Sequence, residues 1–597
     1  MKKLLMALSI CFCVSAFSGC DLSGLLNGFL PESESASQSI ESADSFSVEE
    51  SSEADTSQDS EEHVHEWDGG TLTKNPACEE KGETTYSCAC GESYTEEVAA
   101  LGHAYENRVC TACGWEYFSA GLQYKLLADG SAYEVTKIGE CTDLEVVIPR
   151  KYEGLPVTGI ANYAFRNRGA LTSVIIPASV TSIGESAFEG CESLISVDIP
   201  ASVVSMGQRV FSRCTLLTSI TVSNDNPAYQ SIHGNLYTKD GTTLIQYTIG
   251  KTETSFTIPD FVTNIDVGAF SNCGSLISVE IPNSVTRIGS GAFSNCSLLT
   301  SVEIPDSVTS IERGAFSNCG SLISVAVPDS VTSIGAFAWA FCDALTSVEI
   351  GSSVTNIDAS AFEKCTALTN ITVSEDNTMY QSIDGNLYTK GGEFLKQYAT
   401  GKTATSFTVP DTVTVISDYA LYACVSLECV VIPDSVTKIG ECAFADCESL
   451  VSVEIGESVR MIDGHAFRGC YSLINVKIPD SVERIGEYAF ADCEALTSLE
   501  IGDSVTSIGD YAFETCESLT SVVIPESVES IGYRAFSNCD SLVSLTFSDT
   551  STWYRTDSYT YWEYKKGGTE TDLSDASANV KYFRYTYSYA NYYWYKL

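Results

Sequence analysis

A cysteine recurs every 23 residues through most of this 597-residue chain, and this spacing limits what the chain can fold into. The recurring cysteines form three runs, at positions 191 and 214, at 273, 296, 319, 342 and 365, and at 424, 447, 470, 493, 516 and 539. Each marks one copy of a unit such as residues 282–304, PNSVTRIGSGAFSNCSLLTSVEI. A fixed period of this length predicts a solenoid of stacked repeats rather than one globular core.

Alternation within the unit predicts its local structure. Val302 and Ile304 are expected to point inward, while Ser301 and Glu303 point outward, as in a half-buried strand. The proline that follows ends this strand because it has no N–H for the ladder. Residues 285–288 are expected to form a second short extended piece, and residues 292–296 one turn of 3₁₀ or α-helix. The predicted fold is a β-rich α/β repeat solenoid with a parallel sheet and short helical turns.

The recurring cysteine is expected to be structural. One unit alone cannot bury its apolar side chains, whereas stacked units bury them against identical neighbours. A cysteine at one fixed place in each unit behaves as a small apolar residue whose thiol can meet a backbone group of the loop. Metal or redox chemistry is disfavoured here because reactive cysteines need an electropositive, partly open site.

The repeat pattern IPxSVTxIGxxAFxxCxxLxSVxIP, found over roughly residues 144–547, resembles the BspA-like, or treponemal-type, bacterial surface leucine-rich repeats. The resemblance implies a right-handed leucine-rich-repeat-like array displayed on a bacterial surface. It also implies a role in adhesion or as a protein–protein interaction scaffold, with host or bacterial surface proteins or glycans as partners. The family has no catalytic residues to carry over to this chain.

The N-terminus has the features of an export signal. Residues 1–19 carry two lysines and then an apolar run, and Cys20 follows small residues as in a bacterial lipobox, which predicts a lipidated cysteine. An ordinary secretory signal cleaved nearby is the alternative. Residues 20–62 are rich in Ser, Glu, Asp and Ala and predict a disordered acidic tether. The predicted location is extracytoplasmic, at the cell surface, with the membrane reached only through the lipid.

Residues 63–118 form a small Cys/His module. Its cysteines stand beside glycines, a pattern that suits a zinc site because glycine accepts the tight turn that points two thiolates at one ion. The module also resembles short zinc-ribbon-like modules of surface proteins from anaerobic Gram-positive bacteria. The expected ligands of a structural zinc are Cys78, Cys88, Cys90, His103, Cys110 and Cys113. We expect Cys78 and His103 to join Cys88 and Cys90, and Cys110 and Cys113 to join His63 or His65; disulfides remain the alternative.

The remaining boundaries follow the repeat. Residues 119–160 predict an N-terminal cap with the first strand, and residues 161–550 the 23-residue repeats. Near residues 223–259 and 374–410 two similar insertions lengthen the cysteine step from 23 to 59, and each predicts a β-hairpin, around Asp240–Gly241 and around residues 390–392. They are either contact sites or packed lateral elaborations. Residues 551–597 are unusually aromatic and predict a C-terminal cap, with glycan binding as the alternative.

Charge restricts the classes of partner. The chain has 79 acidic and 33 basic residues and a net charge of −46, which argues against nucleic acid or an anionic membrane as a partner for the bulk surface. Acidic residues recur at the outward position before the last isoleucine of the strand, where we predict a concave binding face. Its residues are Asp198, Glu280, Glu303, Glu349, Glu454 and Glu500. Simple solvation of an exposed sheet is the alternative to binding a basic partner or divalent cations.

No pattern of catalytic residues stands out. The five histidines are not paired with a nucleophile motif, and neither GxSxG nor a phosphate-binding loop is present. We therefore expect a non-enzymatic adhesin or interaction scaffold that needs no cofactor other than structural zinc. A carbohydrate-binding protein that uses the aromatic C-terminal region, and a purely structural surface component, are the other hypotheses.

Overall fold

The computed structural model describes residues 65–106, 109–113, 116–549, 552–556, 569–584 and 592–596. The predicted signal peptide, Cys20, the acidic tether and His63 lie outside the described residues. The chain divides into two compact units, Met1–Leu101 and Gly102–Leu597, and each is considered by itself.

The first unit contains a small antiparallel sheet in the order β1-β2-β3. Its strands are β1 (Thr71–Lys74), β2 (Gly82–Ser87) and β3 (Ser93–Val98). A tight turn joins β2 to β3, in which the Cys88 amide donates to the Glu92 carbonyl at 2.9 Å. Gly91 has φ +98° in this turn, a conformation that glycine accepts without a steric penalty. The turn therefore holds Cys88 and Cys90 at the end of the sheet.

The second unit begins with short antiparallel strands. They are β4 (Tyr105–Glu106) paired with β5 (Val109–Cys110), and β6 (Gln123–Leu126) paired with β7 (Tyr133–Lys137). The β6–β7 hairpin lies within residues 119–160, the predicted N-terminal cap. Strand β7 then pairs in parallel with β10 (Leu155–Ile160), to which β9 (Lys151–Tyr152) adds an antiparallel edge. The repeat array continues from this hairpin.

Each repeat contributes two strands, which we call the main strand and the second strand. Both kinds pair in parallel with the next repeat, so that Ser278 faces Ser301 and Ile265 faces Ile288, each 23 residues further on. The main strands are β8 (Glu145–Val147), β11 (Ser173–Ile175), β13 (Ser196–Ile199), β15 (Ser219–Val222), β19 (Ser255–Thr257), β21 (Ser278–Glu280), β23 (Ser301–Val302), β25 (Ser324–Val327), β27 (Ser347–Ile350), β29 (Asn370–Val373), β33 (Ser406–Thr408), β35 (Cys429–Ile432), β37 (Ser452–Ile455), β39 (Asn475–Ile478), β41 (Ser498–Ile501), β43 (Ser521–Ile524) and β45 (Ser544–Phe547). After β10, the second strands are β12 (Ser182–Ile183), β14 (Ser205–Met206), β18 (Thr243–Gln246), β20 (Asn264–Ile265), β22 (Arg287–Ile288), β24 (Ser310–Ile311), β26 (Ser333–Ile334), β28 (Asn356–Ile357), β32 (Phe394–Gln397), β34 (Val415–Ile416), β36 (Lys438–Ile439), β38 (Met461–Ile462), β40 (Arg484–Ile485), β42 (Ser507–Ile508) and β44 (Ser530–Ile531). The predicted solenoid with parallel strands is confirmed.

The loop of the repeat differs from the predicted helical turn. In the copy around Phe293, the amides of Phe293 and Asn295 donate to carbonyls of the next repeat at 2.7 and 2.8 Å, whereas the amide of Ser294 bonds back to Gly291. Gly291 and Asn295 have φ values of +60° and +61°, which no helix contains. Alternate amides thus point along the array, because bonds between repeats satisfy more of the loop backbone than an isolated helical turn would.

The core is a set of stacked columns that run through the repeats. Phe270, Phe293 and Phe316 are fully buried, and their rings stack face to face with centroids 4.8 and 5.1 Å apart. The Cys296 thiol donates to the carbonyl of Phe270 at 3.1 Å, and ten other recurring cysteines make the same bond to the residue 26 positions earlier. The prediction that this cysteine is a buried, structural residue is confirmed. Burial raises the pKa of the Cys296 thiol to about 12, so it stays protonated.

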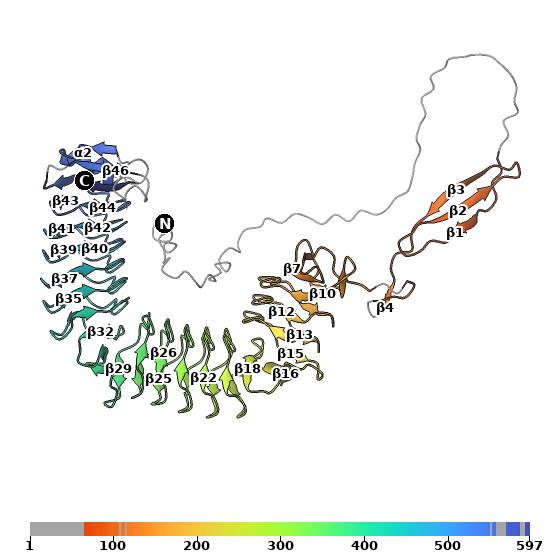
Figure 1. The fold of residues 1–597 in the computed structure, drawn as a ribbon, viewed down its shortest axis with the longest axis horizontal. Coiled ribbons are helices and arrows are strands. Elements are labelled where there is room, and N and C mark those ends of the chain that lie inside the picture. The colour runs from red at the N-terminus through yellow and green to blue at the C-terminus, as the bar shows by residue number, and fades with distance from the viewer. Residues whose placement is uncertain are drawn as a thin grey trace, which may run out of the picture. The chain divides into compact units, whose positions relative to one another are not determined.

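The array of the second unit consists of three straight runs that meet at two corners, as Figure 1 shows. We call them the first leg (β6–β15), the middle leg (β16–β29) and the third leg (β30–β45). The buried apolar side chains form three clusters that follow these legs. Each corner coincides with one of the two insertions, so the insertions divide one repeat pattern into three cores.

The insertions resemble the N-terminal cap in topology. The antiparallel strands β16 (Tyr229–Ile232) and β17 (Asn235–Thr238) lead into β18, and β30 (Tyr380–Ile383) and β31 (Asn386–Thr389) lead into β32. Both predicted hairpins are confirmed, and β18 and β32 each start a new parallel ladder, as β7 does. Each insertion is therefore an internal cap that closes one leg and starts the next.

A lysine fastens each internal cap to the array. Lys251 donates to the His233 carbonyl at 2.7 Å and to Asn235 Oδ1 at 2.8 Å, and it lies over the Tyr247 ring. Lys402 makes the equivalent bonds to Asp384 and Asn386. The hairpins are packed elements of the array, with Tyr237 and Tyr388 each 1% exposed.

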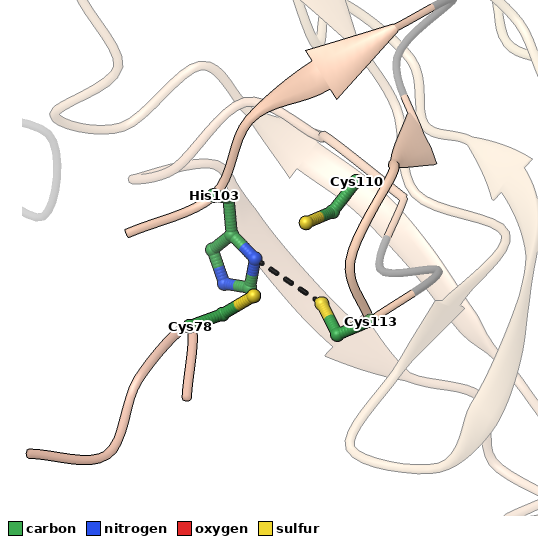
Figure 2. A group of neighbouring side chains, drawn as sticks. All are labelled: Cys78, His103, Cys110 and Cys113. Carbon is green, nitrogen blue, oxygen red and sulfur yellow. Dashed lines mark hydrogen bonds between the residues drawn. The ribbon is translucent and has the colours of Figure 1, made fainter. Parts of the chain in front are cut away.

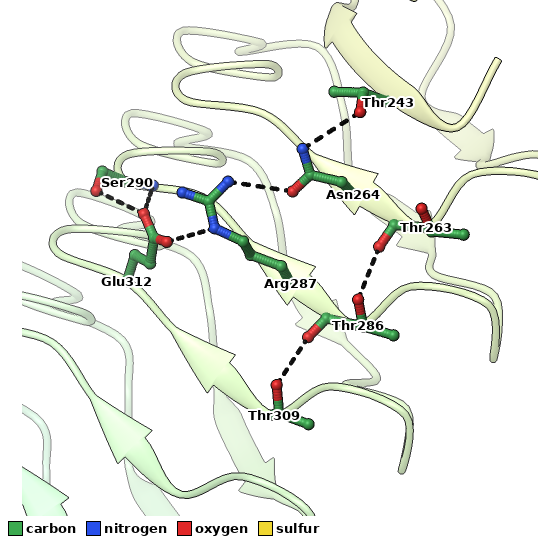
Figure 3. Close-up of polar contacts among 8 residues, drawn as sticks. All are labelled: Thr243, Thr263, Asn264, Thr286, Arg287, Ser290, Thr309 and Glu312. Carbon is green, nitrogen blue, oxygen red and sulfur yellow. Dashed lines mark hydrogen bonds and ion pairs between the residues drawn. The ribbon is translucent and has the colours of Figure 1, made fainter. Parts of the chain in front are cut away.

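Polar side chains also join successive repeats along the second strands. Figure 3 shows the hydroxyls of Thr286 and Thr309, which donate to the carbonyls of Thr263 and Thr286 at 3.2 and 3.3 Å. Beside them Arg287 bonds to Glu312 at 2.5 Å. Glu312 occupies a turn position that is glycine in other repeats. Its negative charge is balanced by the guanidinium of Arg287 in the preceding repeat.

The C-terminal region closes the third leg. Strands β48 (Tyr593–Lys596), β46 (Trp553–Thr556) and β47 (Thr569–Thr571) continue the second-strand sheet from β44 in antiparallel fashion. The helix α2 (Ala576–Phe583) is capped by Asp575, and its Asn579 donates to the Leu545 carbonyl at 2.9 Å. Trp553 and Trp594 are each 1% exposed. These residues thus cover the core and the sheet edge that an open array would leave exposed.

Candidate functional site

The main-strand face carries the acidic residues that the sequence singles out. All six side chains are exposed, but the structure distributes them over the three legs rather than in one row. Glu280 and Glu303 lie on neighbouring repeats of the middle leg, and Glu349 follows after Ala326. Asp198 belongs to the first leg, where Thr221 donates to it. Glu454 and Glu500 belong to the third leg, with Lys477 between them.

An exposed column of β-branched side chains accompanies these acids in the middle leg. Ile277 and Ile323 are 42% and 53% exposed and stand directly before the strand serines, and the same position is threonine in the repeats between and after them. The Thr300 and Thr346 hydroxyls donate to the carbonyls of Ile277 and Ile323 at 3.3 and 3.0 Å, and Thr346 is exposed while Thr300 is half-buried. Sequence reasoning missed this column, although its position in the repeat is visible in the printed sequence.

A wide hollow of about 550 Å³ lies on the same face of the third leg. It is lined by Asp411, residues 431–435 and residues 454–457, among them Glu454 and Glu457. Lys477 forms an ion pair with Glu457 at 3.2 Å at its side. The hollow is therefore acidic, but the carboxylate of Glu457 is already paired with Lys477.

The first unit brings one histidine to two of the predicted cysteine ligands. His65 Nδ1 lies 3.2 Å from the Cys90 sulfur, and the ligand atoms of His65, Cys88 and Cys90 all lie within 4.8 Å of one another. The His65 ring stacks on Trp67 with centroids 5.0 Å apart, which orients it toward the turn. The side-chain hydrogen bond with Cys88 raises the pKa of the Cys90 thiol.

The second unit brings together His103, Cys110 and Cys113, which Figure 2 shows with Cys78. His103 Nδ1 lies 3.3 Å from the Cys113 sulfur, and the three ligand atoms lie within 4.8 Å of one another. The amide of Cys113 and the His103 ring lower the pKa of the Cys110 thiol to about 5, so a thiolate forms at neutral pH. Cys78 belongs to the first unit, so its role as a metal ligand stays a prediction.

The grouping of ligands differs from the one expected from sequence. His65 was expected to join Cys110 and Cys113, and His103 to join Cys88 and Cys90, whereas within the two units the histidines are exchanged. The reason is local, because His65 is held beside the β2–β3 turn by Trp67, which forms an isolated bridge to Cys88. Two thiols and an imidazole are a ligand set that zinc accepts.

Among the described aromatic residues of the C-terminal region, three that could stack on a sugar are internal, whereas Tyr554, Tyr582, Tyr592 and Tyr593 are half-buried. Trp553, Trp594 and Tyr595 are each 1% exposed. Their ring faces are therefore covered in the cap. Within the described part of the chain, no helix has the length and apolar character needed to cross a membrane.

Known proteins point to the same repeat. The family described as "BspA type Leucine rich repeat region" matches residues 151–258, 263–386, 396–520 and 483–566. No curated protein matches the chain.

Solved structures similar to the chain include a leucine-rich cell surface protein of Faecalibacterium prausnitzii, which is 30% identical over 75% of this chain and 96% of that one, with a TM-score of 0.39. A leucine-rich repeat protein of Bacteroides ovatus is 27% identical over 72% of this chain and 94% of that one, with a TM-score of 0.32. The family model covers well over half of the chain, as did the repeat pattern. The chain belongs to the BspA-type leucine-rich repeat family.

Proposed function

We propose that this protein is a non-enzymatic, cell-surface adhesin or protein–protein interaction scaffold. The observation that carries the proposal is the main-strand face, where side chains at fixed outward positions form long exposed columns while the residues between them are buried. Val279 and Val302 are 5% and 8% exposed, whereas Glu280 and Glu303, one residue later, are exposed. Such a face offers an extended surface whose chemistry can change without disturbing the core.

A cell-surface location is supported by the family and by the similar Faecalibacterium protein, which is described as a cell surface protein. We propose that Cys20 carries the lipid anchor. Replacing Cys20 by serine is expected to abolish incorporation of a labelled fatty acid and to release the protein into the medium. Retention of the label after this change would contradict the anchor.

The test of the scaffold role is a binding screen of the chain without its signal peptide against purified matrix proteins, bacterial surface proteins and glycans. We expect saturable binding to a protein partner that weakens with salt, because the exposed columns are acidic. Binding to glycans alone, or to nothing on the screen, would contradict the proposal. Glycan binding by the C-terminal rings is the less favoured alternative, because Trp553, Trp594 and Tyr595 are each 1% exposed, while the described rings of Tyr554, Tyr582, Tyr592 and Tyr593 are half-buried.

We propose in addition that the Cys/His module holds structural zinc. His103, Cys110 and Cys113 would supply three ligands of one ion, and His65, Cys88 and Cys90 would supply three of another, while Cys78 stays a predicted ligand. Metal analysis of the purified chain is expected to find zinc that a chelator removes. Serine at Cys110 and Cys113 should remove the ion held with His103 and so lower the zinc content, whereas serine at Cys296 should leave the content unchanged, because that thiol is buried in the array. Equal zinc in both variants would contradict the assignment.

A further inference from the structure

The main-strand face of the middle leg has an acidic side and an apolar side. We call it the middle-leg strip and define it by three columns. The acidic column contains Glu280, Glu303 and Glu349, the apolar column contains Ile277, Thr300, Ile323 and Thr346, and the serines Ser278, Ser301, Ser324 and Ser347 stand between them. The two outer columns are three residues apart along each strand, which corresponds to about 10 Å.

The strip carries no positive charge of its own. Residues 252–363 contain only two basic residues, Arg287 and Arg313. Arg287 lies on a second strand and is paired with Glu312, and the Arg313 guanidinium lies 4.6 Å from the centre of the Phe337 ring. Asp306 and Asp329, in the turns after the main strands, are exposed and add charge on the acidic side. A partner on this strip therefore meets uncompensated carboxylates along one edge.

The dimensions of the strip select the shape of the partner. Successive repeats are about 4.8 Å apart, and one turn of an α-helix rises about 5.4 Å, so a helix lying along the array presents nearly one turn to each repeat. Same-side residues of an extended strand are about 6.7 Å apart, and they lose register with the columns after two repeats. A helix is also about 10 Å wide, which matches the separation of the acidic and apolar columns.

We infer that the middle-leg strip binds a basic amphipathic α-helix of a protein partner, with its lysine or arginine stripe on the acidic column and its apolar stripe on Ile277 and Ile323. This inference rests on the proposed scaffold function and names the class of partner. Helices of this kind bind through residues at i, i+3, i+4 and i+7 on one face. The carboxylates set the orientation of the helix and speed its approach, and the isoleucines exclude water beneath it.

The third leg exposes Val451 and Ile474 in the equivalent of the apolar column but has an interrupted acidic column, so it provides an internal control. In its acidic column Val431 and Lys477 alternate with Glu454 and Glu500, and Glu428 occupies the apolar column. Lys477 is exposed and repels a basic helix at the centre of the equivalent surface. The helix is therefore expected to bind one leg only.

The probe is a synthetic helical peptide of about 18 residues with lysines on one stripe and leucines on the adjacent stripe. Its control is a scrambled isomer of identical composition and charge that has no apolar stripe. Isothermal titration of the chain without its signal peptide is expected to give one site for the probe, at least about tenfold tighter than the isomer. Equal binding of the probe and its isomer would overturn the inference.

Two sets of substitutions test the two sides of the strip. The triple variant E280Q, E303Q and E349Q removes the charges, and the double variant I277T and I323T installs the residue that other repeats carry at the same position, so both are compatible with the fold. Each variant is expected to bind the probe about tenfold more weakly. The third-leg double variant, with E454Q and E500Q together, should change the affinity less than twofold. Unchanged affinity in both strip variants would also overturn the inference.

The partner found in the binding screen separates this inference from the proposed function. If that partner binds the strip variants as tightly as it binds the unmodified chain, the scaffold role stands and the middle-leg strip is the wrong surface. If the screen yields no protein partner at all, the scaffold role itself fails.

Discussion

The middle leg and the third leg are built from the same repeat and bury the same columns, yet they expose different surfaces. Phe316 and Phe490 are both fully buried and stacked on their neighbours, and Cys319 and Cys493 make the same hydrogen bond. The outward position before the last apolar residue of the strand is Glu280, Glu303, Ala326 and Glu349 in the middle leg, whereas the third leg has Lys477 there. The comparison teaches that stacking constrains the inward residues of each repeat and leaves the outward ones free to specify a partner.

The loops of the two legs differ as well. The loop position five residues before the recurring cysteine is glycine in three repeats of the middle leg, at Gly268, Gly291 and Gly314, whereas three successive repeats of the third leg have His465, Tyr488 and Tyr511 there. The rings of His465, Tyr488 and Tyr511 stack with centroids 4.9 and 4.5 Å apart, so this edge of the third leg is an aromatic ladder. Glu514 lies near it, where the middle leg has serines such as Ser294 and Ser317. The middle leg has Glu363 at the Glu514 position of its last repeat, but its repeats around Phe270, Phe293 and Phe316 carry no titratable group at these loop positions, whereas several repeats of the third leg do.

The largest effect is expected from the shared core. Replacing Phe316 or Phe490 by alanine removes a fully buried ring from an array of stacked rings, and each change should cost about 3–5 kcal/mol of unfolding free energy. Urea unfolding of the two variants checks this value. If one leg tolerated the change at a cost below about 1 kcal/mol, the two legs would not share one stacking principle.

An intermediate effect is expected from Glu514 of the third leg. Burial and the neighbouring Asp492 raise the pKa of the Glu514 carboxyl from 4.5 to about 7, so the neutral form is favoured in the folded state. The stability that this provides is complete below pH 4.5 and is lost as the pH rises toward 7. Replacement by glutamine should therefore raise the unfolding free energy at about pH 8 by about 1–2 kcal/mol, allowing for partial exposure, and change little at pH 4.5. An equal effect at both pH values in urea unfolding would refute the assignment.

His465 gives the opposite pH dependence in the same leg. Burial, and then Arg468, lower the pKa of the imidazole from 6.5 to about 4. Its neutral form contributes stability that is present above pH 6.5 and is lost as the pH falls toward 4. The variant H465Y carries the residue found at Tyr488 and Tyr511. When the pH falls from 6.5 to 4, its free energy of unfolding should decrease by about 1–2 kcal/mol less than that of the unmodified chain. Thermal unfolding followed from pH 7 to pH 4 measures the difference, and parallel pH curves for both proteins would contradict it.

The smallest effect is expected from Lys477. Its ion pair with Glu457 is 3.2 Å long, but both side chains are more than half exposed. Exposed pairs of this kind contribute little to stability, and salt screens them. The variant K477A should therefore unfold at nearly the same urea concentration as the unmodified chain. A larger loss in urea would mean that the outward column of the third leg supports the fold.

Much of the fold follows from periodicity. The period of 23 predicts the array, alternation predicts the main strands, and the Asp240–Gly241 and Gly391–Gly392 pairs predict the hairpins. The loop was predicted as a helical turn because Ala292 and Phe293 suit a helix. Left-handed residues such as Asn295 instead direct alternate amides to the next repeat, a contact that no single repeat reveals.

The candidate site was less accessible to sequence reasoning. The acidic residues could be placed on an outward face, but their distribution over three legs depends on the corners, which arise from tertiary packing of the insertions. The grouping of His65 with Cys88 and Cys90 depends on the Trp67 contact in the folded module. Residue type thus indicates which side chains can be metal ligands, whereas the folded structure is needed to tell which of them lie together.

The most direct test of the claim that outward residues specify the partner is to rebuild the middle-leg strip on the third leg. The double variant E428I and K477E leaves Val451 and Ile474 beside Glu454 and Glu500 and completes both columns there. Isothermal titration with the amphipathic lysine–leucine peptide should then give two bound peptides per chain, compared with one for the unmodified chain. A stoichiometry that stays the same in both proteins would contradict the account.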